Sequence, residues 1–206
     1  MGRRSISVTV GCLFVVQMLA AAVGYALVQR FLDGDSGQVA LRVGALLMLC
    51  AGLAVALIGL LLYPILKPVD RRLALSYAAL RIAELAVTAV CGIYLLVRLE
   101  LVPNYLLWVY VPTGIGGLIL TYLMLVSRLV PRPIALLGLV GYACLTVGVP
   151  LDLLGVLDMG TGAGQILLLP GGLFEVAVLP AWLIARGFAA YPLAGSGVPG
   201  VQVAAG

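Results

Sequence analysis

Six long apolar stretches dominate the sequence, and polar or turn-forming residues separate them. Each stretch is apolar at successive positions over about 20 residues or more, which is the length an α-helix needs to cross the hydrocarbon core of a bilayer. A transmembrane β-barrel would instead show segments of about ten residues in which apolar and polar positions alternate. The sequence therefore predicts an all-α integral membrane bundle of six transmembrane helices, over about residues 6–28, 43–66, 73–97, 105–126, 134–156 and 167–188.

The segments between these stretches are short and rich in residues typical of turns. The joints lie at 33–37, 67–72, 102–104, 130–133 and 158–162. None of them can hold a folded unit of its own, so we expect a single domain over residues 1–190. Residues 191–206 are rich in Gly, Pro and Ala, and we expect them to form a flexible C-terminal tail.

The N-terminus has the charge order of a signal peptide. Arg3 and Arg4 precede the first apolar stretch, and residues 20–22 are three alanines that resemble a cleavage site. The apolar stretch is longer than the core of a typical signal peptide, which has about 7–15 residues. We therefore expect a retained first span that also directs insertion.

Composition and charge agree with a protein that lies in or at the membrane. Of the 206 residues, 64% are hydrophobic and 10% are charged, whereas soluble domains are about half apolar and about a quarter charged. The net charge of +4 comes from basic residues scattered at the ends of the apolar stretches, not from one basic face. The bilayer is the expected partner, and nucleic acid is not.

Lys and Arg are distributed unequally between the two sides of the predicted bundle. If the N-terminus is cytoplasmic, eight of the 12 lie on the cytoplasmic side, three lie outside and Arg81 lies within a span. The eight are Arg3, Arg4, Lys67, Arg71, Arg72, Arg128, Arg132 and Arg186, and the three are Arg30, Arg42 and Arg98. Because Lys and Arg favour cytoplasmic loops, both termini are predicted to be cytoplasmic.

Aromatic residues and cysteines add expectations about the surface and the core. Tyr105, Trp108 and Tyr110 begin the fourth span, where interfacial anchors are common. The four cysteines lie inside apolar stretches without a C-x-x-C spacing, and His is absent. We therefore expect the cysteines to be small core residues, with no metal, no haem and no other cofactor.

No motif in the sequence predicts catalysis. The glycines at 160, 162 and 164 follow no strand and precede no Lys-Ser/Thr pair, so they are not a phosphate-binding loop. Gly195-Ser196-Gly197 lacks the nucleophile-elbow pattern and a His partner. Acidic residues at the interfaces are too dispersed to form an active site. The sequence favours a protein that is not an enzyme.

Charged side chains at membrane depth are the main candidates for function, because each costs a few kcal/mol unless it is paired, hydrated or used. At about 1.5 Å per residue, Arg81 lies about 12 Å and Glu84 about 16 Å from the inner end of the third span. Glu175 lies about 12 Å from the outer end of the sixth span, at a similar level. We expect these three residues to form one polar cluster. Gln17, in the middle of the first span, either joins it or bonds across helices.

Two interpretations of the cluster remain open. In the first, it is a satisfied polar group that holds two helices in register. In the second, Glu84 or Glu175 binds a proton or anchors the polar head of a molecule in a cavity. Asp152 and Arg42 are secondary candidates on the outer side, where either can simply reach headgroup water.

Three segments of the chain carry a family resemblance. They are residues 63–75 with Arg81 and Glu84, residues 127–132, and residues 170–175 with 182–188. In these residues and their order the chain resembles the bacterial and archaeal membrane-protein family known as domain of unknown function 4386. The linker 33–38 is shorter than the outer loop of that family, and Pro133 stands where an aromatic residue is expected. The resemblance implies six helices in a prokaryotic inner membrane and no assigned chemistry.

These observations leave two hypotheses for function. The first is a non-catalytic accessory or binding protein that holds a lipid-like or other amphipathic molecule, or a partner membrane protein. The second is a small transporter, linked to protons through Glu84 or Glu175. A weak similarity of residues 67–75 to 128–136, and of 112–116 to 170–174, would fit the parallel repeats of some transporters.

The unequal distribution of Lys and Arg generates a prediction about topology. A cysteine introduced at position 71 should be labelled by a membrane-impermeant thiol reagent in inverted vesicles and not in intact cells, because the 67–72 loop is expected to be cytoplasmic. A cysteine at position 35, in the loop between the first two spans, should show the opposite pattern. Labelling of position 71 from outside intact cells would overturn the predicted orientation.

Overall fold

The computed structural model describes residues 2–189, and all the regular secondary structure in this part of the chain is helical. Five long helices come first: α1 (Arg3–Leu32), α2 (Gln38–Leu66), α3 (Arg71–Arg98), α4 (Tyr105–Ser127) and α5 (Arg132–Leu153). A sixth helical segment follows, and all six are long and apolar enough to cross a membrane. The predicted all-α fold with six spans is therefore confirmed. The predicted flexible tail, 191–206, lies outside the described residues.

The first three helices extend beyond the stretches that hydropathy marks. They contain 30, 29 and 28 residues, or about 42–45 Å at about 1.5 Å per residue. This exceeds the hydrocarbon thickness of about 30 Å, so their ends reach the headgroup region. Asp70 begins α3, and its carboxylate accepts hydrogen bonds from the backbone N–H groups of Arg72 and Leu73, at 2.8 and 3.0 Å. This cap satisfies two donors that the helix itself leaves free.

The sixth span is not the single α-helix that was predicted over 167–188. It consists of the 3₁₀-helix η1 (Gly162–Leu168), the short helix α6 (Leu169–Leu173), the π-helical segment η2 (Phe174–Val178) and α7 (Leu179–Ala185). Pro170 and Pro180 lie on either side of η2, and neither has a backbone N–H to donate within a helix. The hydrogen-bonding pattern therefore changes along this span, and it does so beside Glu175.

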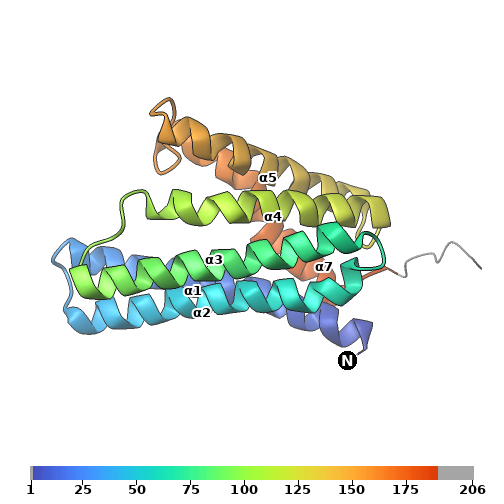
Figure 1. Cartoon of the computed structure of the whole chain (residues 1–206), viewed down its shortest axis with the longest axis horizontal. Helices are drawn as coiled ribbons and strands as arrows, with labels where there is room; N and C mark the ends of the chain where they lie inside the picture. Colours follow the sequence, from blue (N-terminus) through green and yellow to red (C-terminus); the bar gives the residue numbers. More distant parts are fainter. Residues whose placement is uncertain (1, 190–206) are drawn as a thin grey trace, which may run out of the picture.

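The six spans form a closed ring in chain order. Each of α1 to α5 packs against its neighbours in sequence, and the sixth span closes the ring. Its first part, α6, packs against α5, whereas α7 packs against α1 and η2 contacts both. Figure 1 shows the long helices running side by side, with α7 behind α3 and α4. The sixth span thus crosses from one side of the bundle to the other.

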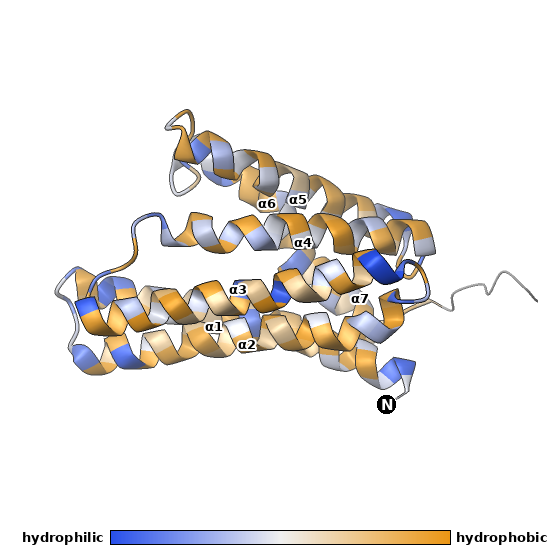
Figure 2. Ribbon diagram, in the orientation of Figure 1, coloured by the Kyte–Doolittle hydropathy of each residue, from blue (hydrophilic) through white to orange (hydrophobic). Residues whose placement is uncertain are grey.

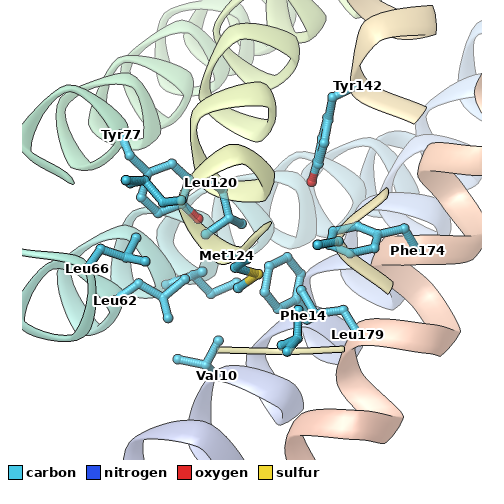
Figure 3. Packing of buried hydrophobic residues seen from close by; sticks show 14 of the residues in the cluster. Val10, Phe14, Leu62, Leu66, Tyr77, Leu120, Met124, Tyr142, Phe174 and Leu179 are labelled. Atoms are coloured by element: carbon cyan, nitrogen blue, oxygen red, sulfur yellow. The ribbon is translucent and has the colours of Figure 1, made fainter. Parts of the chain in front are cut away.

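The two ends of the bundle are packed differently. We call the end that carries residue 3 the N-terminal end, and the end that carries the loops 33–37, 99–104 and 154–161 the distal end. Side chains from all the spans meet in one large core, in which Phe14, Met124 and Leu179 are fully buried (Figure 3). This core reaches the distal end through Leu107, Val149 and Met159. A smaller apolar cluster joins α1, α2 and α3 toward the distal end. The rest of the distal half is more open.

The outer surface is apolar, as a lipid-facing surface must be. Figure 2 shows hydrophilic residues at both ends and only isolated ones at mid-length. Large apolar side chains such as Leu19, Val90 and Val147 are exposed there. The expectation that all four cysteines lie in the core is wrong for Cys12 and Cys50, which are exposed. Periodicity could not place them, because helices that face lipid are apolar on both sides.

Candidate functional site

The structure brings Arg81, Glu84 and Glu175 together in the middle of the bundle. Arg81 Nη1 donates a hydrogen bond to Glu84 Oε2 at 2.8 Å, and Arg81 Nη2 lies 3.6 Å from Glu175 Oε1. Arg81 and Glu84 occupy one face of α3, three residues apart, and Glu175 comes from η2. All three side chains are shielded from the surface, with exposed fractions of 2%, 8% and 12%. One guanidinium therefore lies between two carboxylates.

Two tyrosines complete this cluster, and the sequence reasoning missed both. Arg81 Nε donates a hydrogen bond to the Tyr77 hydroxyl at 3.3 Å, and the guanidinium carbon lies 5.3 Å from the centre of the Tyr77 ring. The hydroxyl group of Tyr142 of α5 donates a hydrogen bond to Glu175 Oε1. Tyrosines in membrane proteins usually lie at the interfaces. A tyrosine that lies inside a predicted span, away from the interfaces, is the signal in the sequence that could have indicated these two polar contacts.

Two glycines let the helices come close enough to form the cluster. A Cβ on Gly117 of α4 would lie 2.1 Å from the Tyr142 ring, so only glycine leaves room for this side chain. A Cβ on Gly59 of α2 would lie 2.8 Å from the Cβ of Arg81. Small residues commonly allow such close contacts between membrane helices. Phe174 packs edge-on against Tyr142, with ring centroids 5.9 Å apart, and fixes the tyrosine from the other side.

A cavity of about 390 Å³ adjoins the cluster on its distal side. Glu84, Glu175 and Tyr142 contribute to the polar part of its lining, and so does Gln17 of α1. Gln17 is buried, with an exposed fraction of 5%. The remaining walls are mainly apolar and aromatic. Typical small-molecule sites have volumes of about 300–1,000 Å³ and a similar lining.

The aromatic walls come partly from residues that were expected at the membrane interface. Tyr105 and Tyr110 of α4 line the cavity together with Tyr25 of α1, and Tyr105 is buried at 8% exposure. The expectation that Tyr105 and Tyr110 are interfacial anchors is therefore wrong. Trp108 does match it, because its ring is 51% exposed and its Nε1 donates to the carbonyl of Pro103 at 3.2 Å. The rotation of α4 decides which aromatic residue points inward.

A second hollow of about 730 Å³ lies at the distal end, and we call it the vestibule. It shares lining residues with the cavity, and these are Tyr25, Tyr105, Leu106, Tyr110 and Leu168. The two hollows therefore adjoin, and together they form a route from the distal loops toward the carboxylates. Toward the opposite end, apolar side chains such as Ile6, Leu66 and Leu183 are buried in the core. There Arg4 also donates to the carbonyls of Ile184 and Ala185, at 2.9 and 3.2 Å.

The secondary candidates behave differently from each other. Asp152 lines the vestibule, and its carboxylate accepts a hydrogen bond from the backbone N–H of Met159 at 2.6 Å, which holds the loop after α5. Arg42 is exposed and lines neither hollow. Asp158 also lines the vestibule. Hydrogen bonds from the Thr161 hydroxyl and the Gly160 N–H lower the pKa of the Asp158 carboxyl, so this group is ionised at neutral pH.

The charges of the cluster limit what it can bind. Two carboxyl groups face one guanidinium, so when both are ionised one negative charge lacks an ionic partner among residues 2–189. Arg81 Nη2 has no hydrogen-bond partner, although it is buried. No set of three acidic or Cys side chains suited to a metal ion occurs in the described part of the chain. The arrangement can take up a proton or hold a positively charged or hydrogen-bonding group.

Comparison with known proteins gives one family. The family model described as "Domain of unknown function (DUF4386)" matches residues 9–105 and residues 93–187. Together these ranges include every residue of the cluster and all the described lining of the cavity. No curated protein and no solved structure matches the chain.

The geometry of the cluster generates a prediction about energetic coupling. Arg81→Ala should lower the free energy of unfolding by about 3–5 kcal/mol, because it leaves two buried carboxylates without their partner. In the presence of Glu175→Gln the same change should cost less, with a coupling energy of about 1 kcal/mol or more. Unfolding in mixed micelles of detergent and SDS measures the free energy of unfolding of the wild type, the two single variants and the double variant.

The control for this cycle is Arg98→Ala, because Arg98 is an exposed residue at the end of the same helix. Its effect on unfolding should simply add to that of Glu175→Gln. Strictly additive effects of Arg81→Ala and Glu175→Gln would show that the two side chains act independently, against the geometry described above.

Proposed function

The chain belongs to the DUF4386 family and is a multi-pass integral membrane protein, and we propose that it binds an amphipathic molecule within the bundle. The polar head of this molecule would lie against Glu84, Glu175 and Gln17, and its chain would lie along the apolar walls of the cavity. The protein would act as a non-catalytic binding or accessory protein, in the plasma membrane of a prokaryote with both termini in the cytoplasm. The vestibule would then open to the outside.

One observation carries this proposal. Two carboxylates and the amide of Gln17 line the same, mainly apolar cavity. Polar groups that face an apolar cavity still have hydrogen-bonding capacity to satisfy, so a ligand or water usually lies beside them. A purely structural cluster would account for the Arg81–Glu84 pair. It would not account for an adjoining cavity into which both carboxylates and the amide of Gln17 face.

The proposal predicts that filling the cavity abolishes binding. Gly172 lines the cavity, and a Cβ added there meets nothing within 4 Å, so a leucine has room to enter. In phosphatidylcholine vesicles, a 12-carbon alcohol that carries a diazirine should label the wild-type cavity in a saturable manner. Gly172→Leu should reduce this labelling about tenfold while the protein stays folded, as mass spectrometry of the labelled peptides would show.

The matched control is Gly92→Leu. Gly92 is also a helix residue whose added Cβ meets nothing within 4 Å, but it does not line the cavity. Its labelling should equal that of the wild type. Unsaturable labelling spread over the lipid-facing surface, unchanged by Gly172→Leu, would contradict the proposal.

A second candidate is transport linked to protons through Glu84 or Glu175. The irregular sixth span supports it, because discontinuous helices form the central binding sites of many transporters. Glu175 lies in the π-helical segment η2, and π-segments occur frequently at functional sites. Transport also needs a state in which the cavity opens toward the N-terminal end.

The two candidates predict different access to the cavity. Thr88 lines the cavity. If the protein is a static binder, a cysteine in place of Thr88 should react with a membrane-impermeant thiol reagent added on the distal side, and should not react with reagent added on the other side. Reaction from both sides would favour transport, because the cavity must then open alternately. The variant Ile82→Cys, exposed on the outside of the same helix, reports background labelling from the lipid phase.

A further inference from the structure

We propose that the preferred occupant of the cavity is a lipophilic cation, meaning an amphiphile with one apolar chain and one positively charged, ammonium-type head. This inference rests on the proposed binding function and adds the charge of the ligand. It follows from the charges and the aromatic rings around the two hollows.

The first argument is the charge imbalance of the cluster. The guanidinium of Arg81 is shared between Glu84 and Glu175, at 2.8 and 3.6 Å. One monovalent cation would balance the remaining negative charge. Unbalanced charge is expensive in a membrane interior, so binding of a cation would recover much of that cost.

The second argument is the direction in which these charges face. Glu84 and Glu175 line the cavity, whereas Arg81 is 1% exposed and does not. The carboxylates therefore lie between the guanidinium and the cavity. A ligand in the cavity meets negative groups first, which disfavours an anionic head such as a phosphate or a carboxylate.

The third argument extends the pattern to the vestibule. Asp152 and Asp158 line it, so the two adjoining hollows together carry four carboxyl groups. No Lys or Arg belongs to the described lining of either hollow. A route lined by one sign of charge attracts ligands of the opposite sign and raises their local concentration.

The fourth argument is the aromatic content of the cavity wall. Tyr25, Tyr105, Tyr110 and Tyr142 all line it. The face of an aromatic ring attracts a cation, and groups of such rings recognise quaternary ammonium ions. The same rings also contact an apolar chain, so this wall suits both parts of a lipophilic cation.

Competition between matched amphiphiles tests the inference. Dodecyltrimethylammonium, dodecanol and dodecyl sulfate carry the same chain with a positive, neutral or negative head. Each should compete with the diazirine alcohol for the cavity of the protein in phosphatidylcholine vesicles, at equal membrane-bound concentration. The cation should compete about tenfold or more better than dodecanol, and dodecyl sulfate should compete least.

The variant Glu175→Gln tests whether the carboxylate of Glu175 causes the preference for the cation. Glu175→Gln keeps the shape of the side chain and leaves the Arg81–Glu84 pair balanced, so we expect it to fold. It should remove the preference for the cation, so that dodecyltrimethylammonium no longer competes better than dodecanol. The control Glu100→Gln changes an exposed glutamate outside both hollows and should behave as the wild type.

The outcomes separate this inference from the proposed function. If dodecanol competes as well as the cation in the wild type, the protein binds amphiphiles but the inference about charge is wrong. The same holds if Glu175→Gln retains the full preference. If none of the three amphiphiles competes and labelling is not saturable, the proposed function itself fails.

Discussion

The guanidinium of Arg81 is the group to which the interior of this bundle must adjust. A positive charge at mid-membrane is tolerated only with partners, and two elements supply them. Its own helix provides Glu84 and Tyr77, and the sixth span provides Glu175. The close approach of neighbouring helices then requires Gly59 beside Arg81. A single buried charge thus accounts for much of the packing around α3.

The irregular sixth span connects this polar centre with the closure of the ring. Its first part packs against α5 and its last part against α1, so it must cross the bundle, and η2 lies at the crossing. Glu175 is therefore presented to Arg81 where the helix has its wider π-helical turn. Closure leaves one packed core along the bundle and, beside it toward the distal end, the cavity and the vestibule.

Stability and binding make different demands on the same residues. The Arg81–Glu84 pair and the tyrosine hydroxyls satisfy most of the polar atoms of the cluster, as a structural role requires. A structural role does not require the second carboxylate, that of Glu175, or the amide of Gln17, and both of these groups line the cavity. Our proposals assign these two groups to a ligand, because hydrocarbon alone offers them no hydrogen bond.

The sequence by itself determined the six spans, their order and the depth of Arg81, Glu84 and Glu175. Hydropathy marks the ends of each span, and the constant rise of the helix converts a position in the span into a depth in the membrane. Only the tertiary structure decided that Tyr142, Tyr105 and Tyr110 point inward, that Cys12 and Cys50 face outward and that the sixth span is broken. The reason is physical. In a soluble helix, the polar face shows which side is exposed, but lipid and protein core are both apolar, so a membrane helix carries little sign of its rotation. The inward faces, and the cavity they enclose, are set by helix packing.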